Sequence, residues 1–551
     1  MESWKKKLKL IVRSSPFPYL LLLAVCLVTG LFASDALSVN ADAVIYPYLF
    51  QDPSPNQLIF SEQHSNLLKF PLFVLQSILP YNYFSFTLVN LALLSATMLG
   101  ILALSVKIIG KRFALHMAIA LSAALIFSPL LVNNLIYTTV RNIEYPIILW
   151  VLYETAKYLT ALRRKPPLSF IFAIITLTIL LAGDFFFAYV SIAPVLMMLT
   201  VLFIVKYSTL KRKFFNFAMA AASLVASVVL SKLLQKALDV VGLYDTNSNY
   251  LNASSPVSSL GEISYALGIA GQQLSSLFGI SLSNPGGLAI GIIVGFAAIS
   301  MACGLLTYIL RQLRKPLAKN TLALLLILTT GAGIFAVYVV SGLSFYTTTD
   351  GQLVPIDGAR YLTLIPILTA ILVPYALPLV TKDTHTRKTL AIILLVLALI
   401  GSVYTTKERY DQYQSTSAKQ EAFSNLADTL GDNQVEVILG GYWTAPMLEF
   451  WSNQEFEYAI VAECNLPSID NARRDWFTPD LGVENKSALV ISMSGGDLPF
   501  LGYCPEDKLL DTYGNPSETS SFSRQNTGLS QVNLWYYDYD LRSKLRPVPL
   551  P

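Results

Sequence analysis

Charged residues are scarce in this sequence. Only 13% of its residues are Asp, Glu, Lys or Arg, whereas 54% are hydrophobic. A soluble chain usually carries about 25% charged residues. The mean hydropathy of +0.53 agrees with this deficit. A soluble globular protein is therefore excluded, and most of the chain is expected to lie in a membrane.

Several chemical signatures are also missing. The chain has three histidines and four cysteines, and the cysteines do not show the close spacing of metal-binding motifs. No glycine-rich phosphate loop and no tandem repeat is present. Basic residues are dispersed among apolar runs and form no continuous stripe, so we expect no nucleic-acid partner.

Apolar runs of the length that a bilayer requires recur along the chain. A spanning helix needs about 20 predominantly apolar residues. The sequence therefore predicts an α-helical polytopic membrane protein with about eleven transmembrane helices. These are 17–34, 84–106, 113–132, 143–161, 168–183, 185–205, 214–234, 287–310, 319–341, 360–380 and 389–405.

The short basic loops predict the orientation of these helices. Lys and Arg are enriched in cytoplasmic loops. The amino terminus and five successive alternate loops are basic, which places the amino terminus in the cytoplasm. An odd number of spans then places the carboxy-terminal part outside. The basic loop residues are Lys107, Lys111, Arg112, Arg163, Arg164, Lys165, Lys206, Lys211, Arg212, Lys213, Arg311, Arg314, Lys315, Lys319, Lys382, Arg387 and Lys388.

Charge divides the chain into two parts. Residues 1–405 contain 28 basic and 14 acidic side chains, whereas residues 406–551 contain 11 and 21. The first part is the predicted transmembrane domain, and the second is a predicted extracytoplasmic domain of α/β or β-rich type, with short alternating strands. An exported compartment permits a disulfide between Cys464 and Cys504. Three outer loops complete the predicted transmembrane domain: 35–83, 235–286 and 342–359.

Charged residues also gather near the outer ends of the predicted helices. Ionisable groups at membrane depth are costly, and they are usually paired or functional. Carboxylates and cations from separate spans at one depth indicate a shared site. The residues in question are Asp35, Asp42, Glu62, His64, Lys69, Arg141, Glu144, Asp184, Asp357 and Arg360.

Simpler interpretations exist for most of these residues, and His64 can be a surface loop residue. Asp35 can end a helix, and Asp42 can lie on the polar face of an interfacial helix. Asp184 can turn a tight hairpin. Arg141 and Glu144 can form a local i,i+3 ion pair, as can Asp357 and Arg360.

Three short motifs in this setting resemble the GT-C superfamily of membrane glycosyltransferases, which includes protein O-mannosyltransferases and lipid A aminoarabinose transferases. They are Asp42–Tyr46 in the first outer loop, Phe70–Leu72 further on, and Arg360–Leu362 at the entry to a late span. The outer carboxy-terminal domain is a further similarity. Many members carry a second acidic residue where this sequence has Ala43. That departure leaves open a requirement for a divalent metal and the choice between Asp35 and Asp42.

The resemblance implies an inverting sugar transfer at the outer face of the membrane, which we expect to be a bacterial plasma membrane. The donor would be a polyprenyl-phosphate-linked sugar held in membrane lipid, and the acceptor a glycan, lipid or protein. Asp42 would be the general base, with Asp35 the second choice. Four cations would bind the donor phosphate: Arg360 first, then Arg141, Lys69 and His64. Four carboxylates would orient the acceptor or pair with an arginine: Asp184, Glu144, Glu62 and Asp357.

A transporter or flippase of a lipid-linked or polar substrate is the main alternative. Such proteins place interrupted helices near mid-membrane and often contain repeated halves. In this sequence the acidic residues gather at the outer boundary, and no halves repeat. A non-catalytic envelope protein is a further alternative, although eleven spans exceed what an anchor requires.

Overall fold

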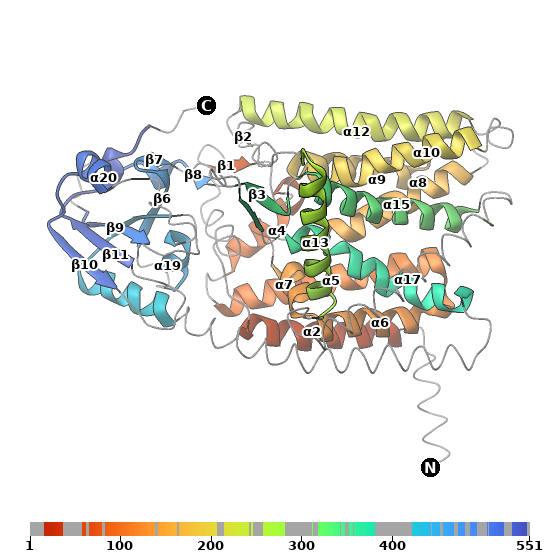
Figure 1. The fold of residues 1–551 in the computed structure, drawn as a ribbon, viewed down its shortest axis with the longest axis horizontal. Coiled ribbons are helices and arrows are strands. Elements are labelled where there is room, and N and C mark those ends of the chain that lie inside the picture. The colour runs from red at the N-terminus through yellow and green to blue at the C-terminus, as the bar shows by residue number, and fades with distance from the viewer. Residues whose placement is uncertain are drawn as a thin grey trace, which may run out of the picture.

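The structure is a computed structural model, and it shows a helical bundle beside a smaller domain that contains a sheet (Figure 1). The following description is confined to these residues: 16–36, 58–61, 66–79, 83–137, 141–161, 165–205, 214–241, 244–245, 257–280, 311, 318–341, 343–347, 352–355, 358–380, 421–441, 444–451, 456–467, 472–479, 485–492, 504, 506–522 and 532–547.

Mostly apolar helices form the bundle, and the longer ones run side by side (Figure 1). Leucine-rich stretches with few charges favour such helices in a membrane, because every backbone group is satisfied inside the segment. Their bounds are α2 (Phe17–Ala36), α5 (Tyr83–Ile109), α6 (Ala114–Phe127), α7 (Pro129–Ile136), α8 (Glu144–Thr160), α9 (Leu168–Gly183), α10 (Ala193–Val205), α12 (Phe214–Val240), α15 (Lys319–Val340), α16 (Ala359–Leu362) and α17 (Leu364–Val380).

The multi-pass membrane architecture agrees with the sequence prediction. Within the described ranges, four helical segments are long and apolar enough to cross a membrane, and three shorter helices are also apolar. The two predicted spans at 287–310 and 389–405 lie outside the described residues, so the number eleven stays a prediction. The four long segments are Phe84–Ile109, Phe214–Val240, Lys319–Val340 and Ala359–Ala376.

The predicted span 113–132 is wrong as a single straight helix. The chain bends by 102° between Lys111–Phe127 and Leu130–Ile136. Pro129 lacks a backbone N–H and cannot continue the helix that precedes it. The Ser128 hydroxyl instead accepts a hydrogen bond from Leu131 N at 3.1 Å and starts α7. Gly279 packs against this break, because a Cβ atom there would lie 2.0 Å from the Phe127 carbonyl oxygen.

The predicted span 185–205 also contains an irregularity. It begins with a π-helical turn, η2 (Ala188–Ile192), and continues as α10. Gly333 of α15 packs against this turn, where a Cβ atom would lie 2.6 Å from the Val190 carbonyl oxygen. Such single π turns are rare inside helices.

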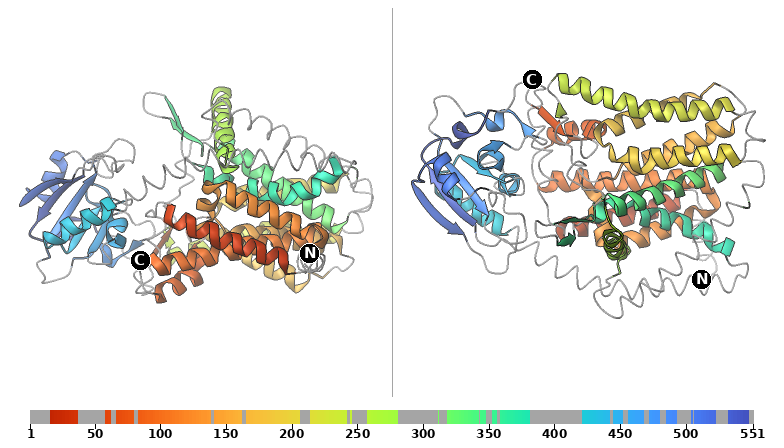
Figure 2. Two further views of the ribbon diagram at one scale, coloured as in Figure 1. Left: turned by 90° about the horizontal axis from the view of Figure 1, so that it is seen from below. Right: turned by 45° about the horizontal axis from the view of Figure 1, so that its top comes forward.

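The segments between the spans carry structure of their own. Helix α13 lies across the direction of the spanning helices in each view (Figures 1 and 2). It starts with a capping box between Ser259 and Glu262, which satisfies its first backbone donors. The bounds are β1 (Leu58–Ser61), α4 (Asn66–Ile78), β2 (Tyr244–Asp245), α13 (Leu260–Leu277), β3 (Phe345–Thr347) and β4 (Leu353–Pro355).

The carboxy-terminal domain is α/β. Its six-stranded sheet has the order β10-β11-β9-β5-β6-β7, in which β5 is parallel to both neighbours. Residues 421–432 form a helix beside it. Cys464 and Cys504 form a disulfide with Cα atoms 5.1 Å apart. The bounds are β5 (Val437–Gly440), α19 (Ala445–Trp451), β6 (Glu457–Glu463), β7 (Leu466–Pro467), β8 (Ala472–Arg473), η5 (Asp475–Phe477), β9 (Ser487–Ser492), α20 (Glu506–Tyr513), β10 (Glu518–Phe522), β11 (Val532–Tyr537) and η6 (Leu541–Lys544).

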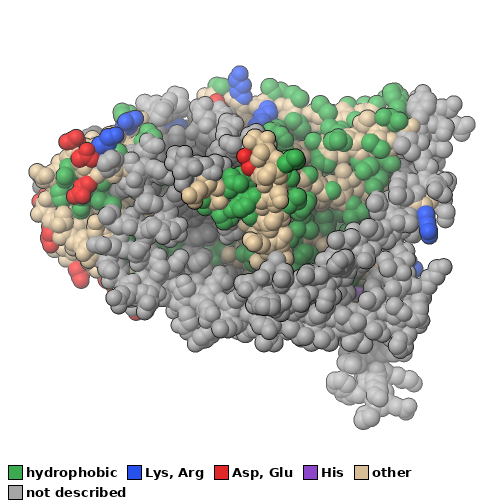
Figure 3. Space-filling model, viewed as in Figure 1, with side chains coloured by type: hydrophobic (Ala, Val, Ile, Leu, Met, Phe, Trp, Pro, Cys, Tyr) green, Lys and Arg blue, Asp and Glu red, His purple; other side chains and the backbone are tan. Residues whose placement is uncertain are grey.

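The surface of the molecule reflects the division of charge. Hydrophobic side chains cover much of the helical part that is visible in Figure 3, whereas acidic side chains are prominent on the carboxy-terminal domain. The acidic residues of α20, Glu506, Asp507 and Asp511, are exposed to solvent. The helical part is therefore suited to lipid and the domain to water.

A small sheet joins the two parts, and we call it the junction sheet. Its strand order is β2-β1-β8, with β1 parallel to β2 and antiparallel to β8. Strands β1 and β2 come from the predicted outer loops 35–83 and 235–286, and β8 comes from the carboxy-terminal domain. The ring centroids of Phe86 in α5 and Phe450 in α19 lie 5.7 Å apart at the same contact. Both loops and the domain therefore lie at one end of the bundle.

The junction sheet predicts a specific cross-link. Ile59 lies opposite Ala472, and directly opposed residues of an antiparallel pair bring their Cα atoms within disulfide range. The variant Ile59→Cys/Ala472→Cys should form a disulfide on mild oxidation, detected by peptide mass spectrometry. The control Leu58→Cys/Ala472→Cys should cross-link far less, because adjacent residues of a strand point to opposite faces. Equal cross-linking of both variants would contradict this register.

Candidate functional site

A buried ion pair joins α4 to α8. Lys69 Nζ lies 2.8 Å from Glu144 Oε1, and both side chains are fully buried. Burial removes water from both charged groups, which costs free energy. A buried ion pair is therefore stable only when its geometry is good and further hydrogen bonds satisfy its remaining polar atoms.

Asn142 supplies those further bonds. Its backbone N–H donates to Glu144 Oε2 at 2.7 Å, so both carboxylate oxygens have partners. Its side-chain amide donates to the carbonyl oxygens of Leu135 and Tyr137 at 3.1 and 2.7 Å. The Asn142 side chain thereby fixes the segment between α7 and α8, which carries Glu144.

A second ion pair lies beside the first. Arg141 donates from Nε to Asp184 Oδ2 at 2.8 Å and from Nη2 to Asp184 Oδ1 at 3.1 Å. This two-point geometry suits a guanidinium and a carboxylate. Asp184 Oδ1 also accepts a hydrogen bond from Phe186 N at 3.2 Å, which places the carboxylate at the turn after α9.

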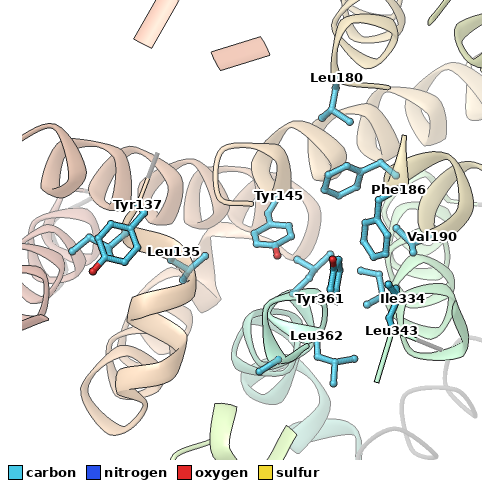
Figure 4. Close-up of a cluster of buried hydrophobic side chains, with 14 of the residues drawn as sticks. Leu135, Tyr137, Tyr145, Leu180, Phe186, Val190, Ile334, Leu343, Tyr361 and Leu362 are labelled. Atoms are coloured by element: carbon cyan, nitrogen blue, oxygen red, sulfur yellow. The ribbon is translucent and has the colours of Figure 1, made fainter. Parts of the chain in front are cut away.

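Aromatic rings enclose the Arg141 guanidinium. Its Cζ atom lies 4.5 Å from the centroid of the Phe186 ring and 4.9 Å from that of Tyr361. Figure 4 shows Phe186, Tyr361 and Tyr145 within one buried cluster. Aromatic faces attract cations, most strongly where water is removed. The Arg141 side chain remains 15% exposed, whereas Asp184 is 3% exposed.

Arg360 reaches the same cluster from α16. Its Cζ atom lies 5.4 Å from the centroid of the Tyr361 ring, whose face also contacts Arg141. Burial lowers the pKa of the Lys69 ammonium and Glu144 raises it, while Asp184 raises it and Arg141 lowers it to a smaller extent, so the two ion pairs interact electrostatically. The site therefore gathers Lys69, Arg141 and Arg360 with two carboxylates, from elements far apart in the sequence.

The structure brings together five of the predicted site residues: Lys69, Arg141, Glu144, Asp184 and Arg360. Asp42, Glu62, His64 and Asp357 lie outside the described residues. Asp35 lies in the last turn of α2, for which only the backbone is described.

The predicted local pairing of Arg141 with Glu144 is wrong as the main contact of either residue. Arg141 pairs with Asp184, and Glu144 pairs with Lys69. Residues 141–143 precede the first helical residue of α8, so the regular i,i+3 spacing of a helix does not apply across them.

Sequence reasoning missed Asn142 and Phe186 as parts of the site, and it singled out Tyr361 only as a member of the motif Arg360–Leu362. Asn142 lies between Arg141 and Glu144 in the sequence, and this position was the signal that its amide could belong to the site. The Phe186 ring gave no signal, because aromatic residues are common in membrane helices.

The described carboxylates do not suit a divalent metal ion. Such an ion takes several unpaired oxygen ligands, whereas Glu144 and Asp184 already hold cations. In the part of the chain that the structure describes, no group of three or more His, Cys, Asp or Glu side chains comes together.

Of the comparisons with known proteins, the comparison with solved structures finds similar ones. No protein-family model and no curated protein matches the sequence. The structure is similar to the crystal structure of ArnT from Cupriavidus metallidurans bound to undecaprenyl phosphate, with a TM-score of 0.52 and 12% identity, over 95% of this chain and 98% of that chain. The apo structure of the same protein aligns with a TM-score of 0.49 and 11% identity, over 96% and 99%.

The chain has an ArnT-like fold. ArnT is a GT-C glycosyltransferase, so the predicted resemblance to the GT-C superfamily is confirmed at the level of the fold. The match includes both the helical bundle and the carboxy-terminal domain, because it extends over nearly the full length of both chains.

The buried pair predicts a large loss of stability when one partner is removed. Glu144→Gln leaves the Lys69 charge buried without its carboxylate, which should cost about 3–5 kcal/mol of unfolding free energy. The measurement is denaturant unfolding in detergent. The control Glu436→Gln neutralises an exposed carboxylate, and it should change the unfolding free energy by about 0.5 kcal/mol or less. Similar losses in both variants would contradict the assigned burial.

Proposed function

We propose that this protein is a membrane glycosyltransferase. It transfers a sugar from a polyprenyl-phosphate donor to an acceptor on the outer face of a bacterial plasma membrane, with its amino terminus in the cytoplasm. The observation that carries the proposal is the ArnT-like fold over 95% of the chain. The solved relative binds undecaprenyl phosphate, a lipid of the class expected as the leaving group of the donor.

The cluster of cations supports this proposal. Transfer of the sugar leaves negative charge on the polyprenyl phosphate, and fixed cations stabilise that charge as it develops. Arg360 and Arg141 are both partly exposed and share the Tyr361 ring. Arg141 uses Nε and Nη2 for Asp184, which leaves Nη1 and the second N–H of Nη2 for a phosphate oxygen.

Lys69 has a different place in the proposal. Its ammonium is fully buried against Glu144 in this conformation. We therefore propose that the positive charge of Lys69 attracts the phosphate without touching it. Lys69 would contact the phosphate only after a local rearrangement. Glu144 and Asp184 then act as positioning residues: Glu144 holds Lys69, and Asp184 holds Arg141. In this proposal neither carboxylate contacts the acceptor.

The proposed reaction is a single displacement. Asp42 takes the proton of the acceptor hydroxyl as the hydroxyl oxygen bonds to the anomeric carbon. The bond from that carbon to the phosphate oxygen breaks, and its electron pair leaves with polyprenyl phosphate. One displacement inverts the anomeric centre. Asp35 is the second choice for the base, and His64, Glu62 and Asp357 remain proposed donor or acceptor contacts.

The role of Asp42 can be tested with proteoliposomes and a panel of undecaprenyl-phosphate-linked sugars. Asp42→Asn should lower kcat by about 10²–10⁴-fold, because it removes the general base. The readouts are glycosylated product and released undecaprenyl phosphate. Asp428→Asn, at an exposed position of the helix 421–432, is the matched control and should retain full activity. Full transfer by a correctly inserted Asp42→Asn variant would remove Asp42 from the mechanism.

The role of Arg360 predicts a different result. Arg360→Gln removes a cation at the leaving phosphate and should lower kcat by about 10²–10³-fold. Arg360→Lys should recover part of the rate, since the charge returns without the two-point geometry. Substrate accumulation in sealed vesicles without any covalent product would instead support the transporter alternative.

A further inference from the structure

Helix α12 presents an apolar face to its surroundings. Only 28% of its most apolar window is buried inside the protein. The exposed residues on this face include Val225, Val229 and Leu233, with 49%, 54% and 58% of their surface accessible. Helix faces of this composition contact lipid acyl chains when the helix spans a membrane.

Two lysines continue this face at one end of the helix. Lys232 and Lys236 are both exposed and lie one turn apart. Lys232 is about 27 Å along the helix axis from Phe214, at a rise of 1.5 Å per residue. A hydrocarbon core is about 30 Å thick, so the two ammonium groups lie at the level of lipid headgroups.

These lysines are at the end of the bundle nearest the carboxy-terminal domain. Helix α12 leads directly into β2, a strand of the junction sheet, and Figure 3 shows basic side chains over this end of α12. Lys and Arg are enriched on the cytoplasmic side of membrane proteins. Two lysines on a lipid-facing helix at the predicted outer end are therefore a departure from the usual distribution.

The positions of these lysines are fixed by neighbouring side chains. Gln235 is buried between them, and its Nε2 donates to the Ala182 carbonyl oxygen of α9 at 2.8 Å. Lys232 Nζ lies 3.8 Å from the centroid of the Phe185 ring. Phe185 in turn packs edge-on against Tyr189, which is 50% exposed. The ammonium thus lies over an aromatic face at the lipid boundary.

We propose that Lys232 and Lys236, together with Phe185 and Tyr189, bind the phosphate headgroup of an anionic phospholipid of the outer leaflet. The apolar face of α12 below them receives the acyl chains. Among the described side chains at this end of α12, Lys232, Lys236 and Asp239 carry a summed charge of +1, and the two lysines attract an anionic headgroup such as that of phosphatidylglycerol. A free phosphate ion would gain nothing from the apolar face.

The test uses the purified full-length chain and two lipids with identical acyl chains, phosphatidylglycerol and phosphatidylcholine. Binding is measured by native mass spectrometry and by lipid titration in neutral detergent. The wild type should prefer phosphatidylglycerol. The variant Lys232→Gln/Lys236→Gln should lose about fivefold in phosphatidylglycerol affinity per lysine, hence about 25-fold for both. Its affinity for phosphatidylcholine should not change.

Two further variants separate this site from general charge effects. Lys107→Gln/Lys111→Gln removes the same charge from exposed positions at the end of α5, which is the end of the bundle away from the carboxy-terminal domain. It should leave the preference for phosphatidylglycerol unchanged. Lys232→Arg/Lys236→Arg keeps the charge and should keep most of the affinity. Phe185→Leu should weaken phosphatidylglycerol binding, since it removes the ring beneath Lys232.

Several results would overturn the proposal. They are unchanged phosphatidylglycerol affinity in the glutamine variant, an equal loss in the Lys107/Lys111 control, and equal losses for both lipids. Displacement of phosphatidylglycerol by undecaprenyl phosphate in the wild type alone would assign the site to the polyprenyl lipid instead. No sugar donor is present in these measurements, so the outcome does not depend on the proposed transferase activity.

Discussion

The two-point ion pair between Arg141 and Asp184 is the interaction on which the candidate site depends. It connects the start of α8 to the end of α9, and the rings of Phe186 and Tyr361 enclose the guanidinium. A charge in such surroundings is stable only while its partner stays in place. The position of Arg141 therefore constrains α8, α9 and α16 together. The Lys69–Glu144 pair adds α4 to the same group of elements.

This arrangement gives the site a defined electrostatic character. Three cations and two carboxylates leave a net positive charge among the described residues of the cluster. In surroundings of low dielectric constant, that charge acts more strongly on an anion than it would in water. The ion pairs also keep the cations oriented before any ligand arrives, which reduces the reorganisation that binding requires.

Much of the architecture was predictable from the sequence, because hydropathy and loop charge are local signals. The nine predicted spans that fall on described residues are helical there. The bend after Phe127 was missed, although Ser128 followed by Pro129 was its signal.

The partners within the site were harder to predict. Arg141 could pair with Glu144 three residues later or with Asp184, 43 residues away along the chain. Only the packing of α8 against α9 decides between them. Asn142 is a similar case, since its role depends on carbonyl oxygens exposed where α7 ends. Pattern reasoning therefore found the charged members of the site but not their pairing.

The junction sheet has a consequence for the synthesis of the protein. Strand β1 precedes nearly all of the bundle in the chain, yet its partner β8 belongs to the carboxy-terminal domain, which is made after the bundle. The pairing of Leu58 with Arg473 therefore cannot form until the carboxy-terminal domain has been made. Contacts between such distant segments form late in folding. Strand β1 thus gains this partner only when the carboxy-terminal domain is present, so a product truncated before β8 would insert its helices and still lack this strand pairing.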